Sequence, residues 1–285
     1  MATSVSNGAS GEFDFSEADF KRVRELIYRQ AGISLADSKR QMVYSRLGRR
    51  LRVLGIRRFD DYLDLVQSGD PAEKEAFINA LTTNLTSFFR EPHHFPILAE
   101  HARQARGREY VVWCSASSTG EEPYSIAITL VEALGHDAAV RILATDVDTN
   151  VLDKAEQGVY PLERVEKMPA EQVRRFFLRG AGAHAGNVKV KPEVRALVTF
   201  RQINLLEDGW PVRGPLDAIF CRNVMIYFDR PTQHTILKRF APLLRPDGLL
   251  FAGHSESLHH AADLFRLRGK TVYEPAARNA RTAHA

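Results

Sequence analysis

The sequence has little of what marks secreted, membrane and metal-binding proteins. It holds two cysteines, Cys114 and Cys221, too few for a disulfide framework. No apolar run approaches the roughly 20 residues of a membrane helix, and no basic region with an apolar core opens the chain. The ten histidines show no metal-ligand spacing. We therefore expect a cytoplasmic protein with no metal, in which both cysteines are small buried residues at strand ends.

The chain is otherwise of ordinary composition and long enough for two domains. Hydrophobic residues make up 44% and charged residues 26% of its 285 residues, as in globular domains generally. Apolar residues at helical spacing predict an all-helical N-terminal domain over 12–82. Its expected helices cover 16–32, 38–54, 59–66 and 71–85, whereas the chain ends, 1–11 and 276–285, are expected to be disordered or loose.

One stretch of this domain is basic without a single acidic residue. Residues 39–58 contain eight Lys and Arg side chains, whereas the whole chain carries +4, so the rest of the chain is net acidic. A solvated helix face is the ordinary explanation of a charge run, but an unmixed run of this density predicts an acidic partner. That partner can be nucleic acid, phospholipid or an acidic protein surface.

A connecting segment, 83–106, follows the helical domain. The stretch 81–91, where this segment starts, mixes polar and aromatic residues, and their spacing fits neither a helix nor a strand. The segment can be a mere linker. Its Asn, Thr and Ser side chains beside Arg90 favour a binding loop instead.

The rest of the chain is organised around residues 110–125. Apolar residues 110–113 predict a buried strand, and a helix follows with Pro123 in its first turn. The loop between them has one glycine, Gly120, so it is not a dinucleotide fingerprint. Glu121 and Glu122 would repel a phosphate but suit hydroxyls or a positive charge, both of which S-adenosylmethionine offers. An ordinary turn of an α/β sheet is the alternative.

A second acidic position follows the next predicted strand, 140–145. Asp146 stands at its end, about 25 residues beyond Gly120, and near this spacing an acidic residue of a doubly wound fold binds ribose hydroxyls. A helix-capping Asp is the alternative, as we predict for Asp148. Together with the loop, Asp146 favours a nucleoside ligand.

Strands and helices alternate over 107–276, which predicts an α/β fold with a doubly wound, Rossmann-like sheet. A turn-rich stretch predicts a small antiparallel β insertion at about 160–196. The topology places Arg222, Asn223 and Tyr227, beyond a buried strand, in the same crevice as Gly120. Further along, we expect a helix end, a turn and a strand over 244–255, and the last strand at 271–273.

Four long motifs stand out in the sequence. They are Thr83-Asn84-Leu85-Thr86 through Phe89-Arg90-Glu91, Ser118-Thr119-Gly120-Glu121-Glu122-Pro123-Tyr124-Ser125, Cys221-Arg222-Asn223-Val224-Met225-Ile226-Tyr227-Phe228, and Gly253-His254-Ser255-Glu256. Together they resemble the CheR family, the S-adenosylmethionine-dependent methyltransferases that esterify glutamates of bacterial chemotaxis receptors. The resemblance runs from Phe20 to Tyr273. It implies a methyltransferase sheet, protein-glutamate O-methyltransferase activity, S-adenosylmethionine as cofactor and S-adenosylhomocysteine as product.

The resemblance also implies individual site residues. Arg90 and Tyr227 match catalytic positions near the reacting methyl group. Gly120 of the loop and Arg222 of the crevice are further cofactor-binding candidates from the fold argument. The positions that match the family's cofactor-binding residues are Asn84, Thr86, Arg90, Glu121, Asp146, Asn204, Leu205 and Asn223.

Two receptor contacts follow from the same resemblance. The family's basic second helix faces the receptor's cytoplasmic helices, and in a subset of members the β insertion adds the receptor's C-terminal pentapeptide as a strand. The residues concerned are Lys39, Arg40, Arg46, Arg49 and Arg50, and Arg179, Gly180 and Lys189. Lys189 replaces the arginine usual in close relatives, which weakens bidentate recognition of a carboxylate. We expect a monomer recruited to membrane receptor arrays, with no nucleic-acid partner and no membrane insertion.

The implied reaction needs no general base, because a glutamate with an ordinary pKa of about 4.3 is ionised at neutral pH. His254 is therefore interpreted as structural, and Arg90 is assigned a positioning role. Two alternatives stay open. One is a non-catalytic S-adenosylmethionine sensor that docks receptors. The other, less favoured, is a nucleic-acid methyltransferase, whose Asn/Asp-Pro-Pro-Tyr/Phe and Pro-Cys motifs this sequence lacks.

Overall fold

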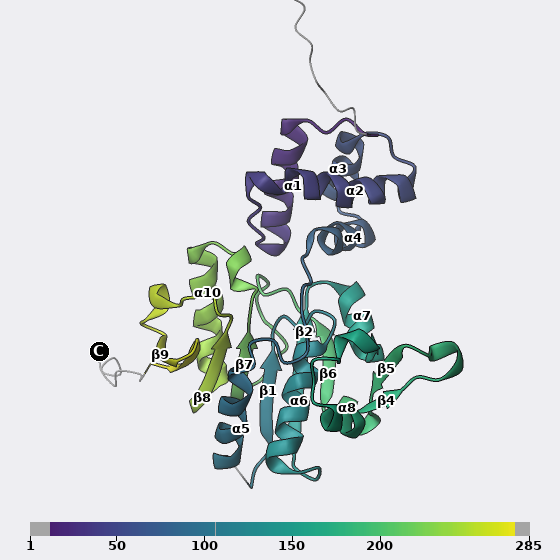
Figure 1. The fold of residues 1–285 in the computed structure, drawn as a ribbon. Helices are drawn as coiled ribbons and strands as arrows, with labels where there is room; N and C mark the ends of the chain where they lie inside the picture. Colours follow the sequence, from purple (N-terminus) through teal and green to yellow (C-terminus); the bar gives the residue numbers. More distant parts are fainter. Residues whose placement is uncertain (1–11, 106, 277–285) are drawn as a thin grey trace, which may run out of the picture. The chain divides into compact units, whose positions relative to one another are not determined.

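The structure, a computed structural model, describes residues 12–105 and 107–276. It divides into two compact units between Thr82 and Thr83 (Figure 1). The predictions of a disordered start, 1–11, and of a loose end, 276–285, fall on residues outside the described ones, except for Ala276, whose N–H donates to the Leu264 carbonyl oxygen at 2.8 Å. Among the described residues, no helix is both long enough and apolar enough to span a membrane.

The N-terminal unit is all-helical, as predicted. Its α-helices are α1 (Glu17–Ala31), α2 (Arg40–Leu54), α3 (Phe59–Gln67) and α4 (Pro71–Leu81), and the short helix η1 (Asp37–Lys39) precedes α2. Helix α1 starts with a reciprocal cap: the Asp19 N–H donates to Ser16 Oγ at 3.1 Å, and the Ser16 N–H donates to Asp19 Oδ2 at 2.8 Å. The buried side chains include Phe20, Val23, Ile27, Val43, Leu47, Leu51, Phe59 and Phe77.

The predicted helix over 71–85 is too long, because α4 ends at Leu81. Thr82 has an extended backbone, with φ −67° and ψ 150°. Its hydroxyl donates to the Asn79 carbonyl oxygen at 3.0 Å. Two β-branched residues, Thr82 and Thr83, favour this exit from the helix. Asn84 and Thr86 consequently lie in an extended loop.

The second unit is built on a seven-stranded sheet of order β6-β2-β1-β7-β8-β10-β9. The pairs among β6, β2, β1, β7 and β8 are parallel, and β10 and β9 are antiparallel (Figure 1). The order reverses between β1 and β7, where the carboxyl ends of the strands form a crevice. This confirms the Rossmann-like prediction. The strands are β1 (Tyr110–Cys114), β2 (Val140–Asp146), β6 (Val198–Gln202), β7 (Leu216–Cys221), β8 (Leu244–Ala252), β9 (Phe265–Gly269) and β10 (Val272–Pro275).

Strand β1 shows why both faces of the sheet are covered. Its alternate residues Tyr110, Val112 and Cys114 pack into one apolar cluster with α5 and α6, and Val111 and Trp113 pack into a second cluster with α10. Cys114 and Cys221 are both buried and free. The helices of this unit are α5 (His94–Gln104), α6 (Glu121–Leu134), α7 (Thr149–Gln157), α8 (Ala170–Phe176), α9 (Pro192–Arg195) and α10 (Arg230–Phe240).

The predicted β insertion is a three-stranded antiparallel sheet of order β3-β5-β4. Its strands are β3 (Val159–Pro161), β4 (Phe177–Arg179) and β5 (Asn187–Val190). In Figure 1 this small sheet lies beside α7 and α8.

Near the C-terminal end of the seven-stranded sheet, one prediction is wrong and one strand was missed. Leu244 is not a helix end: α10 stops at Phe240, and β8 already starts at Leu244. The register of β8 on β7 shifts in the stretch that holds Pro246 and Gly248, which hides the strand pattern. Strand β9 was not predicted, because its arginines and the exposed Leu267 conceal the apolar alternation.

Candidate active site

The loops that follow β1, β2 and β6 meet at Asp146, the last residue of β2. Its Oδ2 accepts a hydrogen bond from the N–H of Ser118 at 2.8 Å, and its Oδ1 accepts one from the N–H of Asp148 at 3.1 Å. The N–H of Ile203 donates to the Asp146 carbonyl oxygen at 3.1 Å. Asn204, the residue after Ile203, therefore lies close in space to the end of β2, as expected where neighbouring parallel strands end at one edge of the sheet.

Asn84 fastens the connecting segment to the same place. Its Nδ2 donates to Asp148 Oδ2 at 2.8 Å, and Ser118 Oγ donates to its carbonyl oxygen at 3.2 Å. Asp148 is also the N-cap of α7, which confirms its predicted capping role. Burial raises the pKa of the Asp146 carboxyl to about 6, although the backbone N–H groups act to lower it.

Glu121 begins α6 directly after Gly120, whose φ of 96° is left-handed. A Cβ at position 120 would lie 2.7 Å from the Tyr160 hydroxyl, so only glycine fits. The Glu121 carboxylate is fully buried and accepts from the Thr119 hydroxyl and from Arg164, each at 2.6 Å. Arg164 belongs to the short helix η2 (Leu162–Arg164) of the β insertion. The insertion thus holds a predicted cofactor residue in place.

The loop after β7 carries a buried guanidinium. Arg222 is 4% exposed; its Nη1 donates to Glu122 Oε2 at 2.7 Å, and its Nη2 lies 3.3 Å from Glu91 Oε2. The same Nη2 donates to the carbonyl oxygen of Arg90, whose own Nη1 donates to the Leu85 carbonyl oxygen at 2.8 Å. Arg222 therefore joins α6, the connecting segment and the end of β7. These partners are protein groups, and a contact of Arg222 with the cofactor stays a prediction.

Two carboxylates balance this cation. Burial raises the pKa of Glu91, but the hydrogen bond with His254 at 3.0 Å and the charge of Arg222 outweigh burial and bring the pKa down to about 2. Burial also raises the pKa of Glu122, and the charge of Arg222 opposes that rise. The contact with Glu91 supports our interpretation of His254 as structural.

Backbone strain is concentrated in these loops. Phe89, Glu91, Ser118 and Asn223 have left-handed φ angles of 50°, 54°, 47° and 58°. A non-glycine residue held in this region costs roughly 1–3 kcal/mol. Because all four residues lie in loops with predicted cofactor residues, the contacts described above hold the crevice in a fixed conformation against this cost.

The other predicted residues of the crevice lie in the same loops. Thr86 is half-buried in the connecting segment, and Leu205 is buried beyond β6. Tyr227 ends the short helix η4 (Met225–Tyr227) and is half-buried.

The predicted receptor-binding residues belong to other elements. Those of the basic run lie at η1 or within α2, and those of the insertion lie on or next to β4 and β5. The first group is Lys39, Arg40, Arg46, Arg49 and Arg50, and the second is Arg179, Gly180 and Lys189.

A metal ion is disfavoured at the best-placed ligand group. Glu91, His93 and His94 hold possible ligand atoms within 4.8 Å of one another. However, Arg222 lies 3.3 Å from the same Glu91 carboxylate, so a cation there would face a guanidinium. The absence of a metal stays a prediction.

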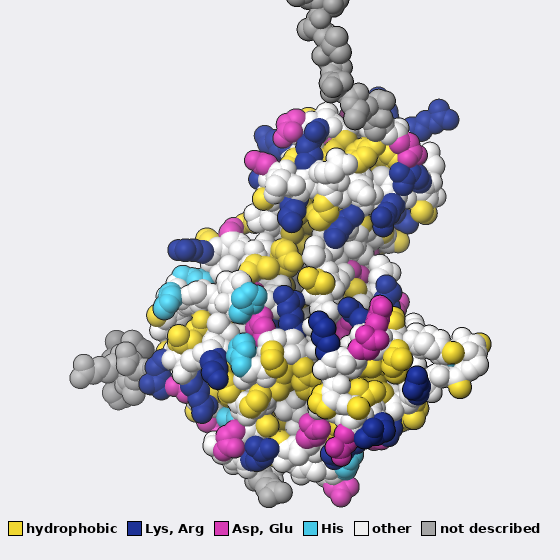
Figure 2. Space-filling model, viewed as in Figure 1, with side chains coloured by type: hydrophobic (Ala, Val, Ile, Leu, Met, Phe, Trp, Pro, Cys, Tyr) yellow, Lys and Arg dark blue, Asp and Glu magenta, His cyan; other side chains and the backbone are white. Residues whose placement is uncertain are grey.

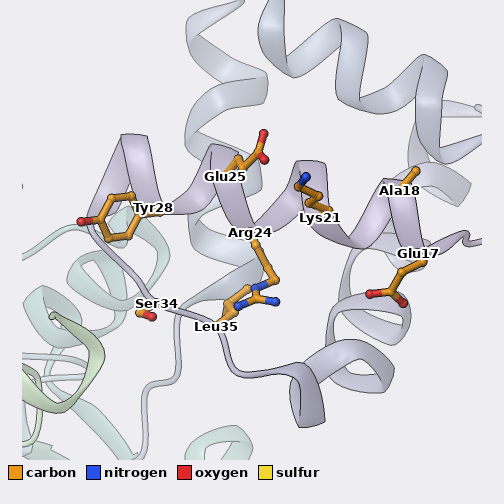
Figure 3. A pocket seen from close by; sticks show the side chains of 8 residues that line it. All are labelled: Glu17, Ala18, Lys21, Arg24, Glu25, Tyr28, Ser34 and Leu35. Atoms are coloured by element: carbon orange, nitrogen blue, oxygen red, sulfur yellow. The ribbon is translucent and has the colours of Figure 1, made fainter.

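A separate hollow of about 610 Å³ lies along α1 in the N-terminal unit (Figure 3). Charged side chains of both signs line it, and none of the predicted site residues does. The residues that line the hollow include Glu17, Lys21, Arg24, Glu25, Tyr28 and Leu35.

The hydrogen-bond acceptors of the crevice suit S-adenosylmethionine. Asp146 and Glu121 offer carboxylate oxygens, which accept hydrogen bonds from hydroxyls and balance a positive charge. An acidic residue at the start of α6 disfavours a phosphate at that helix end. The fold and the crevice together define a methyltransferase that uses S-adenosylmethionine.

Sequence comparison narrows this class to one family. Residues 84–274 match the family model "CheR methyltransferase, SAM binding domain", and residues 18–82 match "CheR methyltransferase, all-alpha domain". The chain belongs to the CheR methyltransferase family, which confirms the resemblance in its motifs.

Relatives of known name agree with this assignment. The chain is 59% identical over 281 residues to chemotaxis protein methyltransferase 2 of Pseudomonas aeruginosa, with 97% of this chain and 100% of the relative covered. It is 56% identical over 260 residues to the chemotaxis protein methyltransferase of Escherichia coli, with 90% and 91% covered. It is 56% identical over 273 residues to that of Salmonella typhimurium, with 95% and 94% covered. The protein is thus an S-adenosylmethionine-dependent methyltransferase of chemotaxis.

Sequence reasoning assigned no role to several residues that shape the crevice. Glu91 and Glu256 lay within the quoted motifs but were not singled out, and Arg164 lay in the insertion. Glu122 was expected to suit a hydroxyl or a positive charge of the ligand, but its carboxylate pairs with Arg222. A charge-balance argument could have found Glu91 and Glu122 as the partners of Arg222, because a buried arginine next to a strand end requires acidic partners. Nothing in the local sequence identifies which glutamates these are.

Replacing Glu91 with glutamine should destabilise the protein in a pH-dependent way. Its pKa falls from 4.5 to about 2 on folding. The stabilisation is therefore complete above about pH 4.5 and is lost as the pH falls toward about 2. We expect E91Q to lose about 2–3 kcal/mol of unfolding free energy at about pH 7, and about 1 kcal/mol less than that at about pH 3.5.

Urea unfolding of wild type and variant at the two pH values measures this difference. Glu100→Gln, in an exposed pair with Arg103 on α5, is the matched control and should change little at either pH. A loss for E91Q that is equal at both pH values would contradict the electrostatic account.

Proposed function

We propose that the protein transfers the methyl group of S-adenosylmethionine to glutamate side chains of methyl-accepting chemotaxis receptors, forming methyl esters. One observation carries the proposal. The described carboxylates of the crevice are already held by N–H groups, hydroxyls or cations, and none is placed as a free general base; they are Glu91, Glu121, Glu122, Asp146 and Glu256. An acceptor that is ionised at neutral pH, such as a glutamate, needs no such base.

The bound cofactor would supply a methyl group on a positive sulfur. The acceptor's carboxylate oxygen would bond to the methyl carbon, and the electrons of the broken carbon–sulfur bond would stay on sulfur. Glu121 and Asp146 would bind the cofactor's polar groups, and Arg90 and Tyr227 would align the acceptor. The remaining cofactor-binding residues we propose are Asn84, Thr86, Gly120, Asn204, Leu205, Arg222 and Asn223.

Two exposed apolar side chains support removal of water from the acceptor. Leu85 is 76% exposed, and Arg90 bonds its carbonyl oxygen; Ile226 is 53% exposed and precedes Tyr227. A hydrated carboxylate is a weak nucleophile, so apolar surface beside Arg90 and Tyr227 would assist the attack.

The basic helix would face the receptor, and the structure separates its side chains into two kinds. Arg50 forms an ion pair with the buried Glu73, with Nη2 and Oε2 2.5 Å apart. Arg46 Nη1 donates to the Thr82 carbonyl oxygen at 2.5 Å. Within the part of the chain that the structure describes, Lys39 and Arg49 are exposed, and their side chains make no hydrogen bond or ion pair. Figure 2 shows Lys and Arg side chains over the visible face of this unit. We assign receptor contact to the two unpaired cations.

The β insertion would hold the receptor's C-terminal pentapeptide. Strand pairing places Val159, Lys189 and Leu178 in one cross-strand row, and Val159 and Leu178 are 43% and 49% exposed. A cation between two apolar side chains suits a peptide with an acidic group and apolar neighbours. Strand β4 is an edge strand, to which a peptide can add next to Arg179 and Gly180.

Methyl transfer to a purified receptor cytoplasmic domain tests the proposal. We expect label from S-adenosylmethionine to be incorporated, to be released as methanol in mild base, and to disappear when the acceptor glutamates become alanine. Base-stable label would contradict ester formation. Cofactor binding without transfer to any of several receptors would favour a sensor, and salt-sensitive transfer to DNA or RNA would favour the nucleic-acid alternative.

Arg49→Ala should raise the receptor concentration needed for half-maximal methylation several-fold at low salt, while the melting temperature stays unchanged. Arg50→Ala should instead lower the melting temperature, because it leaves the Glu73 carboxylate buried without a partner. Arg103→Ala, an exposed cation on α5, is the control and should change neither. Equal receptor affinity for wild type and R49A would refute our assignment of Arg49.

A further inference from the structure

Glu256 is a buried carboxylate to which the family comparison and the sequence give no role. It is 4% exposed. Its Oε2 accepts hydrogen bonds from the N–H groups of Asn223 at 2.9 Å and Gly253 at 2.5 Å, and its Oε1 accepts one from the N–H of Ile226 at 3.3 Å. Among the described residues, no cation pairs with it. One carboxylate thus binds the backbone of two loops, those after β7 and β8, through charge-assisted hydrogen bonds.

Position 253 has no room for a side chain, so only glycine fits there. A Cβ at this position would lie 2.5 Å from Asn223 Nδ2, 2.8 Å from Glu256 Oε2 and 2.9 Å from the Asn223 backbone nitrogen. Each distance is shorter than side chains tolerate, and the backbone nitrogen cannot move aside as a flexible side chain could. Gly253 therefore permits the close approach of the two loops that Glu256 holds.

The held segment contains two residues of the proposed methyl-transfer site. Asn223 has a left-handed φ of 58°, and its amide donates to Glu91 Oε1 at 3.3 Å. The chain then turns through η4, where the Tyr227 N–H donates to the Val224 carbonyl oxygen at 3.1 Å. The contacts of Glu256 at Asn223 and Ile226 bracket this turn, so they hold its strained conformation at both ends.

We propose that Glu256 and Gly253 are positioning residues: the Glu256 carboxylate holds the backbone of 223–227, so that Asn223 faces the cofactor and Tyr227 faces the acceptor. Neither side chain needs to touch the cofactor. This inference rests on the proposed function, which places Asn223 and Tyr227 at the cofactor and the acceptor.

Binding of S-adenosylhomocysteine to the full chain, measured by titration calorimetry, tests the proposal. Glu256→Ala removes both acceptor oxygens and should raise Kd about tenfold or more, as expected for lost hydrogen bonds to a charged group. Glu256→Gln keeps one acceptor oxygen and should recover part of the affinity. Gly253→Ala displaces the same atoms and should raise Kd by a similar factor.

The double variant distinguishes shared positioning from general damage. Both substitutions release the same segment. The Kd of E256A/G253A should therefore be only slightly higher than the higher of the two single-variant Kd values. The control is Asp217→Ala at the other end of β7, which breaks buried contacts with Arg108 and Arg245. It should lower the melting temperature and leave Kd unchanged.

Each outcome has a distinct meaning. Wild type that does not bind S-adenosylhomocysteine would refute the cofactor site itself. Wild-type binding with unchanged Kd in the variants would overturn the positioning role alone, as would factors that multiply in the double variant. If E256A does not fold, E256Q and G253A, singly and combined, give the same comparison.

Discussion

The crevice depends on one buried guanidinium. Arg222 lies at the point where the strand order reverses, and it is bound by Glu122 of α6 on one side and by Glu91 of the connecting segment on the other. Removing one partner of a buried cation lowers the free energy of unfolding by about 3–5 kcal/mol, so Arg222 and its partners are expected to form or break their contacts together. Arg222 therefore holds together three chain segments that are distant in sequence, and these contacts fix the positions of the loops of the crevice.

This constraint explains why so much strain can persist nearby. Phe89, Glu91, Ser118 and Asn223 hold unfavourable backbone angles, and each lies in a segment fixed by buried hydrogen bonds or ion pairs. Asp146 and Glu256 act in a similar way, because each uses one carboxylate to accept hydrogen bonds from backbone N–H groups of its own loop and of a neighbouring loop. A crevice fixed in this way suits a reaction in which alignment, rather than proton transfer, does most of the work.

Much of the fold could be predicted because its signals are local. Ser16 and Asp19 specify a helix start, and a buried apolar strand followed by Pro123 specifies the central strand and helix. The strand-end rule also led from Asp146 to the crevice. The helix after Pro71 was predicted too long because Leu85 continues the apolar spacing of Leu81, whereas the β-branched Thr82 and Thr83 end the helix. Strand β9 was missed because its polar residues hide the alternation.

The contacts that fix the crevice could not be predicted in the same way. Arg222 and its partner Glu91 are separated by most of the sheet in sequence, and nothing near either residue indicates the other. The sequence placed Arg222 at the crevice but not the direction of its guanidinium. That direction follows from the register of β1 on β7, which only the assembled sheet defines.

Hydrogen exchange of Arg222→Lys in the absence of cofactor tests this account most directly. A lysine carries one compact charge and cannot bridge Glu91, Glu122 and a carbonyl oxygen together. We predict that the hydrogen-bonded amides of Phe89 and Arg90 exchange about tenfold faster than in wild type or more, while those of the central strands β1 and β7 stay protected. Unchanged exchange of these two amides would show that Arg222 does not hold the connecting segment, and would contradict the account.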